Sequence, residues 1–260
     1  MAPILTLRSV VAGYGAGDIL RGVDLEVQPA TVTCLIGPNG AGKSTVLKTI
    51  SGLLRPTSGT VTFRGEQMNK LSPRTRLRRG IAHVPQDRSL FPAMSVWDNL
   101  LMGGYAIKDQ KVVRERVAAA VEAFPLCVAR ARDHAGSLSG GEQKQVELAR
   151  TLVLDPGLIL LDEPSIGLDP KARGAVFASI RQLAAAGRTV LLVEQNARSG
   201  LAASDMGAVL ETGVVRLVAT GADLLGDPEV ARLYLGGHAA MSVGATPTGP
   251  TTPDNSEGAR

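Results

Sequence analysis

The stretch Gly37-Pro38-Asn39-Gly40-Ala41-Gly42-Lys43-Ser44-Thr45 matches the pattern G-x-x-x-x-G-K-[S/T] at every fixed position. A short β-branched run over 31–36 precedes it, and a helical pattern over 43–54 follows it. Strand, glycine loop and helix are the context that a phosphate-binding loop requires. The glycines let successive backbone N–H groups turn toward an anion, and the helix N-terminus adds partial positive charge. The chain is therefore expected to bind a nucleoside triphosphate.

Two carboxylates define a second candidate element of the same site. Asp162 and Glu163 directly follow the apolar run 158–161, which reads as a strand. In such a site Lys43 reaches the β- and γ-phosphates, while Ser44 and Asp162 hold Mg²⁺, Asp162 through water. Glu163 points elsewhere and is free to polarise an attacking water. The alternative for the phosphate loop is a glycine-rich turn with an incidental lysine. The alternative for Asp162 and Glu163 is that the two acids only begin a loop.

Composition narrows the class of protein. A chain of 260 residues can bury a large core as one domain or two. It has no apolar run near the length of about 18 residues that spans a bilayer, and its N-terminus does not resemble a signal peptide. We therefore expect a cytosolic protein. Cys34 and Cys127 have no second Cys or His at ligand spacing, and for Cys34 we predict a buried free thiol.

The charge pattern does not suggest a nucleic-acid partner. The net charge is only +4. The densest basic cluster follows Ser72-Pro73, which is typical of a helix start. We interpret this cluster as a solvated helix face, with contact to an acidic partner or to lipid headgroups as the alternative. Its members are Arg74, Arg76, Arg78 and Arg79.

Strand-like and helix-like segments alternate along most of the chain, which predicts an α/β fold with a largely parallel sheet. A mostly helical subdomain is predicted as an insertion at about 88–150, within a folded domain over 1–237. Residues 238–260 are rich in Ala, Gly, Pro, Thr and Ser, and we predict a disordered tail. Strands are predicted at 4–12, 19–27, 58–65, 80–84, 158–161 and 189–193. Helices are predicted from 95 and over 111–124, 142–154, 170–186 and 197–203. A flexible turn is predicted at 12–17, and a last hairpin is predicted around 212–213.

The stretch Leu138-Ser139-Gly140-Gly141-Glu142-Gln143 is the most specific motif in the chain. Ser139 can cap the next helix, and Glu142 can close a capping box. The two glycines expose backbone N–H groups at the helix start, which makes a second anion site. This motif resembles the LSGGQ or LSGGE signature of the ATP-binding-cassette (ABC) family. In that family the signature of one subunit binds the γ-phosphate held by the phosphate loop of another, so that two ATP molecules lie in a head-to-tail dimer.

The resemblance covers about 4–237 and implies a P-loop NTPase fold with a RecA-like core, an antiparallel β-subdomain and a helical subdomain. It implies that Tyr14 stacks on adenine, that the loop at Gln86 senses Mg²⁺ and the attacking water, and that 165–169 crosses the dimer interface. The resemblance implies that the catalytic residues are Lys43, Gln86, Glu163 and Gln195. The residues implied to hold magnesium are Ser44, Gln86 and Asp162. The residues implied to bind ATP are Tyr14, Gly37, Pro38, Asn39, Gly40, Ala41, Gly42, Lys43, Ser44, Thr45, Ser139, Gly141 and Gln143.

One position departs from the general family pattern. Most ABC ATPases place a histidine where this chain has Gln195, within Val193-Glu194-Gln195-Asn196-Ala197. A glutamine amide can donate a hydrogen bond to phosphate but cannot carry positive charge. This stretch resembles the F-type ATP-binding subunit of branched-chain amino-acid importers. Stretches at 80–85, 90–92, 98–103 and 228–237 agree. His83, His134 and His238 are expected to have no catalytic role.

The resemblance implies an energy-coupling ATPase at the cytoplasmic face of the inner membrane. Its implied partners are two membrane permease subunits, a second and different ATPase chain, and indirectly a solute-binding protein. The alternatives are a urea or amide importer, an exporter, and a soluble ABC protein that acts on ribosomes or DNA. Phe91, in a loop, is expected to contact a membrane-subunit helix, whereas Trp97 is equally compatible with a place in the helical insertion's own core.

Overall fold

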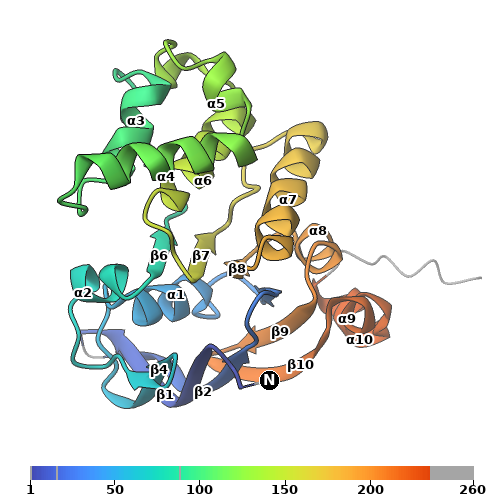
Figure 1. Cartoon of the computed structure of the whole chain (residues 1–260). Helices are drawn as coiled ribbons and strands as arrows, with labels where there is room; N and C mark the ends of the chain where they lie inside the picture. The colour runs from blue at the N-terminus through green and yellow to red at the C-terminus, as the bar shows by residue number, and fades with distance from the viewer. Residues whose placement is uncertain (1, 16, 88, 235–260) are drawn as a thin grey trace, which may run out of the picture.

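The structure is a computed structural model that describes residues 2–15, 17–87 and 89–234 (Figure 1). It confirms the predicted α/β class, because its strands form two sheets and its helices pack around and between them. The predicted tail at 238–260 lies outside the described residues. Among the described residues, no helix combines the length and the apolar character needed to cross a membrane.

The central sheet has six strands in the order β10-β9-β3-β8-β7-β6. Its strands run parallel except β10, which pairs antiparallel with β9. Every residue of β3, β7 and β8 is buried, as expected for parallel strands covered on both faces. The strands are β3 (Val32–Ile36), β6 (Ile81–Val84), β7 (Leu158–Asp162), β8 (Thr189–Val193), β9 (Met206–Glu211) and β10 (Val214–Thr220).

The second sheet is antiparallel, in the order β2-β1-β4-β5. Helix α1 (Lys43–Ser51) lies between the two sheets, and its Val46, Leu47 and Ile50 belong to one core with both of them. That core covers one face of the central sheet and holds the start of α1 against it. The strands are β1 (Leu5–Tyr14), β2 (Gly17–Val27), β4 (Ser58–Phe63) and β5 (Glu66–Gln67), and the short helix α2 (Pro73–Arg78) follows them.

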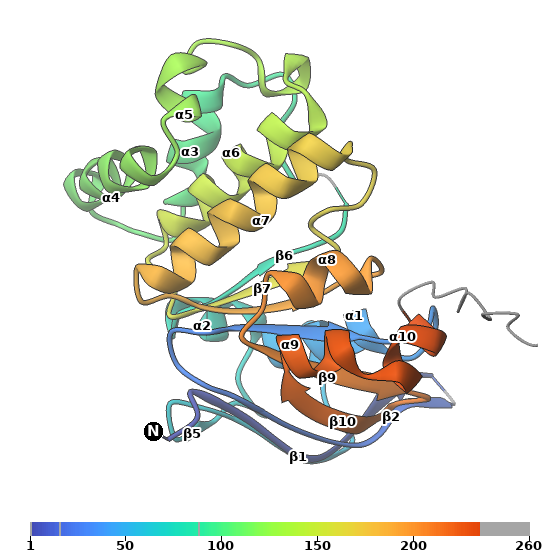
Figure 2. The same ribbon diagram turned by 90° about the vertical axis from the view of Figure 1, so that its right-hand side faces the viewer.

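Most of the other helices pack on the opposite face of the central sheet, around a second core. Helices α3 to α6 stand together at one end of the molecule, and α7 runs beside α6 (Figures 1 and 2). Helices α3 to α6 occupy much of the interval 88–150 that the sequence suggests for an insertion. The bounds are α3 (Val96–Gly103), α4 (Gln110–Ala123), α5 (Leu126–Ala129), α6 (Gly140–Leu152), α7 (Pro170–Ala185), α8 (Ala197–Ala202), α9 (Gly221–Gly226) and α10 (Pro228–Tyr234), with a 3-10 turn at Ala135–Ser137.

Two local expectations differ from the structure. The helix expected over 43–54 ends at Ser51, because Gly52 adopts a left-handed conformation with φ of 83° and terminates it. The turn expected at 12–17 is shorter than predicted, because β1 and β2 pair almost to its tip, with Tyr14 opposite Gly17. The pairs Ala12–Leu20 and Gly13–Asp18 continue the hairpin through most of the expected turn.

The interpretation of the basic cluster as a solvated face is wrong for one of its four members. Arg74, Arg78 and Arg79 are exposed, but Arg76 is 0% exposed. Its Nη1 donates to the carbonyl oxygens of Thr49 and Ile50 at 2.7 and 2.8 Å, in the last turn of α1. A guanidinium satisfies carbonyls that a helix end leaves unpaired and complements its dipole. Arg76 therefore fastens α2 to the end of the phosphate-loop helix.

Arg76→Met is expected to destabilise the fold by about 3 kcal/mol, because it leaves buried carbonyls without a donor. In a chain of this size that loss lowers the midpoint of thermal unfolding by about 10 °C. Differential scanning calorimetry measures the shift. Arg78→Met, an exposed arginine on the same helix, is the control and should shift the midpoint by less than about 2 °C. Equal shifts in the two variants would contradict the role of Arg76.

Candidate nucleotide site

The carboxyl ends of the parallel strands bring the predicted residues together. Leu35 in β3, Val193 in β8 and Asp162 in β7 form one row across the sheet. Because β8 lies between β3 and β7, the loops that follow these two strands start about 10 Å apart. The phosphate loop begins two residues after Leu35, and Gln195 lies two residues after Val193. The site therefore forms at the sheet edge where ligands of open α/β folds bind.

The phosphate loop needs its glycines for close packing. A Cβ on Gly37 would lie 2.1 Å from the carbonyl oxygen of Leu210, and Gly42 adopts a left-handed conformation with φ of 104°. Gly42 also precedes α1 without any side-chain cap, so the start of this helix presents its own N–H groups. Pro38, Asn39 and Gly40 are exposed, whereas Ala41 and Thr45 are buried beneath the loop. This arrangement suits an anion above the start of α1.

Lys43 is buried and folds back over the phosphate loop. Its Nζ donates to the carbonyl oxygens of Gly37 and Pro38 at 2.8 and 3.1 Å. Burial lowers the pKa of the Lys43 ammonium, whereas the carboxylates of Glu163 and Asp162 act in the opposite direction. The ammonium thus lies within the loop that would enclose a phosphate and can exchange carbonyl partners for phosphate oxygens.

Ser44 and Asp162 meet at the inner side of the loop. The Ser44 hydroxyl donates to Oδ1 of Asp162 at 2.9 Å, although the two residues are 118 positions apart. Burial raises the pKa of Asp162, and the hydrogen bond from Ser44 acts against that rise. A hydroxyl and a carboxylate in contact are oxygen donors of the kind that Mg²⁺ prefers, so the pair fits this ion. Gln86, the third predicted magnesium residue, is exposed beyond the end of β6.

Glu163 follows Asp162 with an unusual backbone conformation. Its φ is 47°, a conformation that non-glycine residues seldom adopt, and its N–H donates to the Val193 carbonyl at 3.0 Å. Its side chain lines a groove of about 370 Å³ together with Gln195, Ser165 and Asn196. Burial raises the pKa of Glu163, and the nearby Lys43 ammonium lowers it. Asp162 thus contacts Ser44 and Glu163 lines the groove, while both carboxylates act on the Lys43 ammonium.

Glu194 is a residue of this site that sequence analysis missed. It is buried, and its Oε1 accepts a hydrogen bond from the Ser165 N–H at 3.0 Å, which fastens the loop 165–169 to the end of β8. Burial raises the pKa of Glu194, and hydrogen bonds from Ser165 act against the rise. A charged residue directly after an apolar strand was the available signal, because the same pattern identified Asp162.

The signature stretch lies at the start of α6, in the helical part of the molecule, whereas the phosphate loop starts α1 between the sheets (Figures 1 and 2). Ser139 caps α6 and forms the expected capping box with Glu142. Gly141 packs so closely on α7 that a Cβ would lie 2.8 Å from the Cβ of Ala172. Gln143 is only 9% exposed, and its amide donates to the Leu138 carbonyl at 2.9 Å. Its side chain therefore stabilises the motif from within.

Tyr14 and the described histidines lie at separate places in the structure. The Tyr14 ring is 50% exposed at the end of β1, and Nζ of Lys48 lies 5.8 Å from its centroid. This distance places the Lys48 ammonium in cation–π range of the ring. His134 is engaged with the Ala93 carbonyl at 2.9 Å, and His83 lies on β6 beside a groove described below. His238 lies outside the described residues.

A phosphate loop that begins a helix between two sheets, with an acid pair beside it, defines a nucleotide-binding ATPase domain. Residues 20–166 match the model of the family described as "ABC transporter". The chain belongs to the ATP-binding proteins of this family. It is 41% identical to the high-affinity branched-chain amino-acid transport ATP-binding protein BraG of Pseudomonas aeruginosa, over 90% of this chain and 100% of the relative. It is 38% identical to the probable branched-chain amino-acid transport ATP-binding protein LivF of Archaeoglobus fulgidus, over 86% and 95%.

Similarity also extends to an export protein and to solved cassettes. The lipopolysaccharide export system ATP-binding protein LptB of Haemophilus influenzae is 34% identical over 90% of this chain and 97% of the relative. The ADP conformation of an ATP-binding cassette of an ABC transporter superposes with a TM-score of 0.82 at 29% identity, covering 91% of this chain and 100% of that chain. The resemblance inferred from the signature stretch is thereby confirmed, and the chain is an ATP-binding subunit of a transporter.

Proposed function

We propose that this chain is the ATP-hydrolysing, energy-coupling subunit of an importer for branched-chain or other hydrophobic amino acids. The similarity to BraG along nearly the whole chain carries the proposal, because that relative's name specifies branched-chain amino-acid transport. The stretch Val193–Ala197, with Gln195 beside Glu163 in one groove, supports the same subfamily. The chain would act as a peripheral subunit at the cytoplasmic face of the inner membrane.

The proposed chemistry assigns separate tasks to the residues of the site. Lys43 would stabilise the charge of the β- and γ-phosphates, and the N–H groups at the start of α1 would bind their oxygens. Ser44, Gln86 and Asp162 would hold Mg²⁺, which neutralises phosphate charge when bound. The Glu163 carboxylate would orient the attacking water and accept its proton.

Gln195 would contribute through its amide. It lies beside Glu163 in the groove and can donate a hydrogen bond to a phosphate oxygen. Because an amide carries no positive charge, we expect slower hydrolysis than in a site with histidine at this position. Alternatively, the glutamine would make the two ATP sites of the dimer unequal.

Two such chains are needed for a complete site under this proposal. The exposed start of α6 at Ser139, together with the backbone at Gly141, would bind the γ-phosphate held by a second ATPase chain. The family resemblance favours a different chain as that partner. The buried Gln143 would act indirectly, by fixing the turn that presents Ser139.

The raised pKa of Glu163 leads to a pH prediction. A general base works as the carboxylate, so turnover is present above its pKa and is lost as the pH falls through it. Since burial raises this pKa, the acid limb of the kcat/KM profile should lie above the value of about 4.3 of an ordinary glutamate. Steady-state phosphate release at constant ionic strength between pH 4 and 9 measures it. An acid limb at or below the ordinary value would contradict the assignment of the base.

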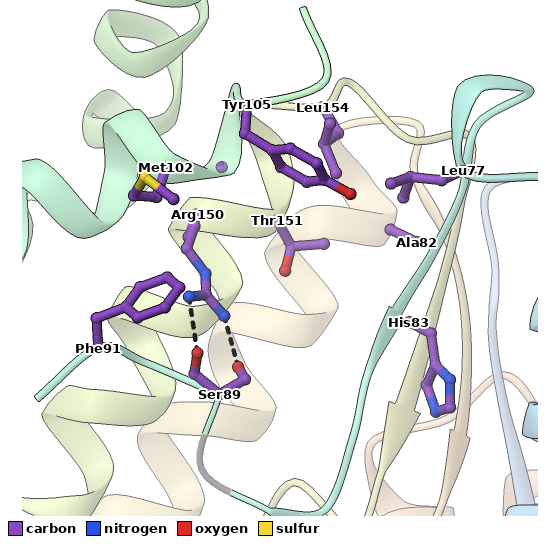
Figure 3. Close-up of a pocket in the computed structure, with 11 residues that line it drawn as sticks. Leu77, Ala82, His83, Ser89, Phe91, Met102, Tyr105, Arg150, Thr151 and Leu154 are labelled. Carbon is purple, nitrogen blue, oxygen red and sulfur yellow. Dashed lines mark hydrogen bonds between the residues drawn. The ribbon is translucent and has the colours of Figure 1, made fainter. Parts of the chain in front are cut away.

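A groove lined in part by Ser89 and Phe91 is the surface that we propose for contact with the permease subunits. It has a volume of about 450 Å³ and lies between β6 and helices α3 and α6 (Figure 3). Phe91, Met102 and Tyr105 bring exposed apolar side chains to it, and Phe91 is 44% exposed. Trp97 is 40% exposed on α3, so it does not belong to the core of the helical part. A solvent-facing apolar groove of this kind suits a partner helix.

The test is recovery of tagged Glu163→Gln protein from membranes of the native host in the presence of ATP. Two membrane subunits and a second ATPase are expected with it, and cells that lack the chain should lose leucine uptake that the parent gene restores. Recovery of ribosomes or nucleic acid without membrane subunits would overturn the proposal. The similarity to LptB makes an export subunit the second candidate, and membrane subunits with unchanged leucine uptake would favour it.

A further inference from the structure

Ser89, three residues after Gln86, is held by two side chains of the signature helix α6. Its N–H donates to Oε1 of Glu147 at 2.8 Å, and its hydroxyl contacts the same oxygen at 3.1 Å. From the other side, Nη1 of Arg150 donates to the Ser89 carbonyl at 2.8 Å and Nη2 donates to its hydroxyl at 2.6 Å (Figure 3). Every polar group of Ser89 thus has a partner on α6.

The two side chains that hold Ser89 are themselves fixed. Glu147 is buried, and its second carboxylate oxygen accepts from Nζ of Lys144 at 2.6 Å, one turn earlier on the same helix. Burial lowers the pKa of the Arg150 guanidinium, and the Glu147 carboxylate acts against that decrease. Charge-assisted hydrogen bonds in such a partly buried place are stronger and shorter than neutral ones. The attachment of Ser89 is therefore firm.

Phe91 is attached in the same way to the helical part. Its N–H donates to Oδ1 of the buried Asn99 at 2.9 Å, and its carbonyl accepts from Nδ2 of Asn99 at 3.0 Å. The Phe91 ring also lies 5.9 Å from the Arg150 guanidinium. Pro85, Gln86 and Asp87, by contrast, are exposed. The backbone is thus fastened to α3 and α6 at Ser89 and Phe91, immediately after the exposed stretch that carries Gln86.

We propose that Glu147 and Arg150 are positioning residues that tie Gln86 and Phe91 to the signature helix. By binding Ser89, they fix the position of Gln86 at the nucleotide site and the position of Phe91 relative to α6. The other end of α6 carries Ser139. A shift of α6 then moves Gln86 and Phe91 together. The attachment of Ser89 to α6 does not depend on the proposed function. Only its effect on turnover rests on the proposed role of Gln86.

The experiment compares Glu147→Ala and Arg150→Lys with the parent and with Glu115→Ala, an exposed glutamate on α4 that serves as the control. Arg150→Lys keeps the charge and loses the paired donors. Hydrogen exchange read out at single residues is followed at Ser89 and along α6. Exchange at Ser89 should accelerate about tenfold in Glu147→Ala, because that variant removes the acceptor of the Ser89 N–H. In Arg150→Lys the acceleration should be smaller, because the N–H keeps Glu147 and only the bonds to the Ser89 carbonyl and hydroxyl are weakened. The α6 amides and the control should be unchanged.

Kinetics separate a positioning role from a merely structural one. The dissociation constant for ATP should stay at the parental value, while kcat falls several-fold. Combining Glu147→Ala with Gln86→Ala should lower kcat no further than Gln86→Ala alone, because both changes remove the same contribution. Additive losses, unchanged exchange at Ser89, or equal loosening of α6 would overturn the proposal. If Gln86→Ala leaves kcat unchanged, the proposed role of Gln86 is wrong. Accelerated exchange at Ser89 would in that case still support the attachment of Ser89 to Glu147 and Arg150.

Discussion

Glu163→Gln is expected to keep ATP binding and to lose about 10³-fold in turnover. A positioned general base contributes 10²- to 10⁴-fold, and glutamine can hold a water but cannot accept its proton. The structure is compatible with this assignment, because Glu163 lines a groove together with Gln195 and lies near the Lys43 ammonium. The two side chains are nearly equal in size, so the fold should be unaffected.

Phosphate release under saturating ATP measures the loss, and equilibrium binding of a fluorescent ATP analogue measures retained affinity. Glu115→Gln, at an exposed position on α4, is the matched control and should turn over at the parental rate. With hydrolysis blocked, ATP should also shift Glu163→Gln toward a larger species in sedimentation velocity, together with its partner ATPase. Turnover near the parental rate in Glu163→Gln would reject Glu163 as the base.

Lys43→Ala is expected to lower turnover by about 10² to 10³, or to abolish nucleotide binding, since one charge-stabilising donor is lost. The ammonium has no substitute among its immediate contacts, which are the carbonyl oxygens of Gly37 and Pro38. Its removal also takes away one of the two lysines that lower the pKa of Asp162, although Lys48 remains. The loss should therefore appear in ATP affinity as well as in kcat.

Titration calorimetry with ATP and Mg²⁺ and steady-state phosphate release measure both effects. Lys111→Ala removes an exposed lysine from α4 and should leave both values at the parental level. Lys43→Arg keeps the charge but carries a larger planar group, and we expect it to fail as well, because the ammonium lies within a closed loop. Parental affinity and turnover in Lys43→Ala would reject its place at the phosphates.

Local patterns in the sequence predicted much of the fold. The strands over 31–36, 158–161 and 189–193 and the helix from Pro170 are apolar or capped segments whose boundaries the structure moves by about one residue. The capping box of Ser139 and Glu142 forms as predicted. These features depend on residues within one or two turns of one another, so periodicity and cap chemistry are sufficient to identify them.

Other features depend on contacts between distant segments. Composition classed Arg76 with its exposed neighbours, but the end of α1 packs over α2 and buries it. The hydrogen bonds of Glu194 and Ser89 could not be predicted for the same reason, since their partners Ser165 and Glu147 belong to other elements of the chain. Helix α5 also went unpredicted, because a single turn after Pro125 leaves little periodic signal.

The phosphate loop, the acid pair and the signature can be identified without a structure, because each motif is continuous in the chain. The contact of Ser44 with Asp162, and the groove that Glu163 and Gln195 line together, form only in the folded chain. The physical reason is the strand order, in which β8 separates β3 from β7 and aligns Leu35, Val193 and Asp162 in one row. Hydrogen-bonded register between strands more than a hundred residues apart therefore assembles the candidate site, and no local pattern encodes that register.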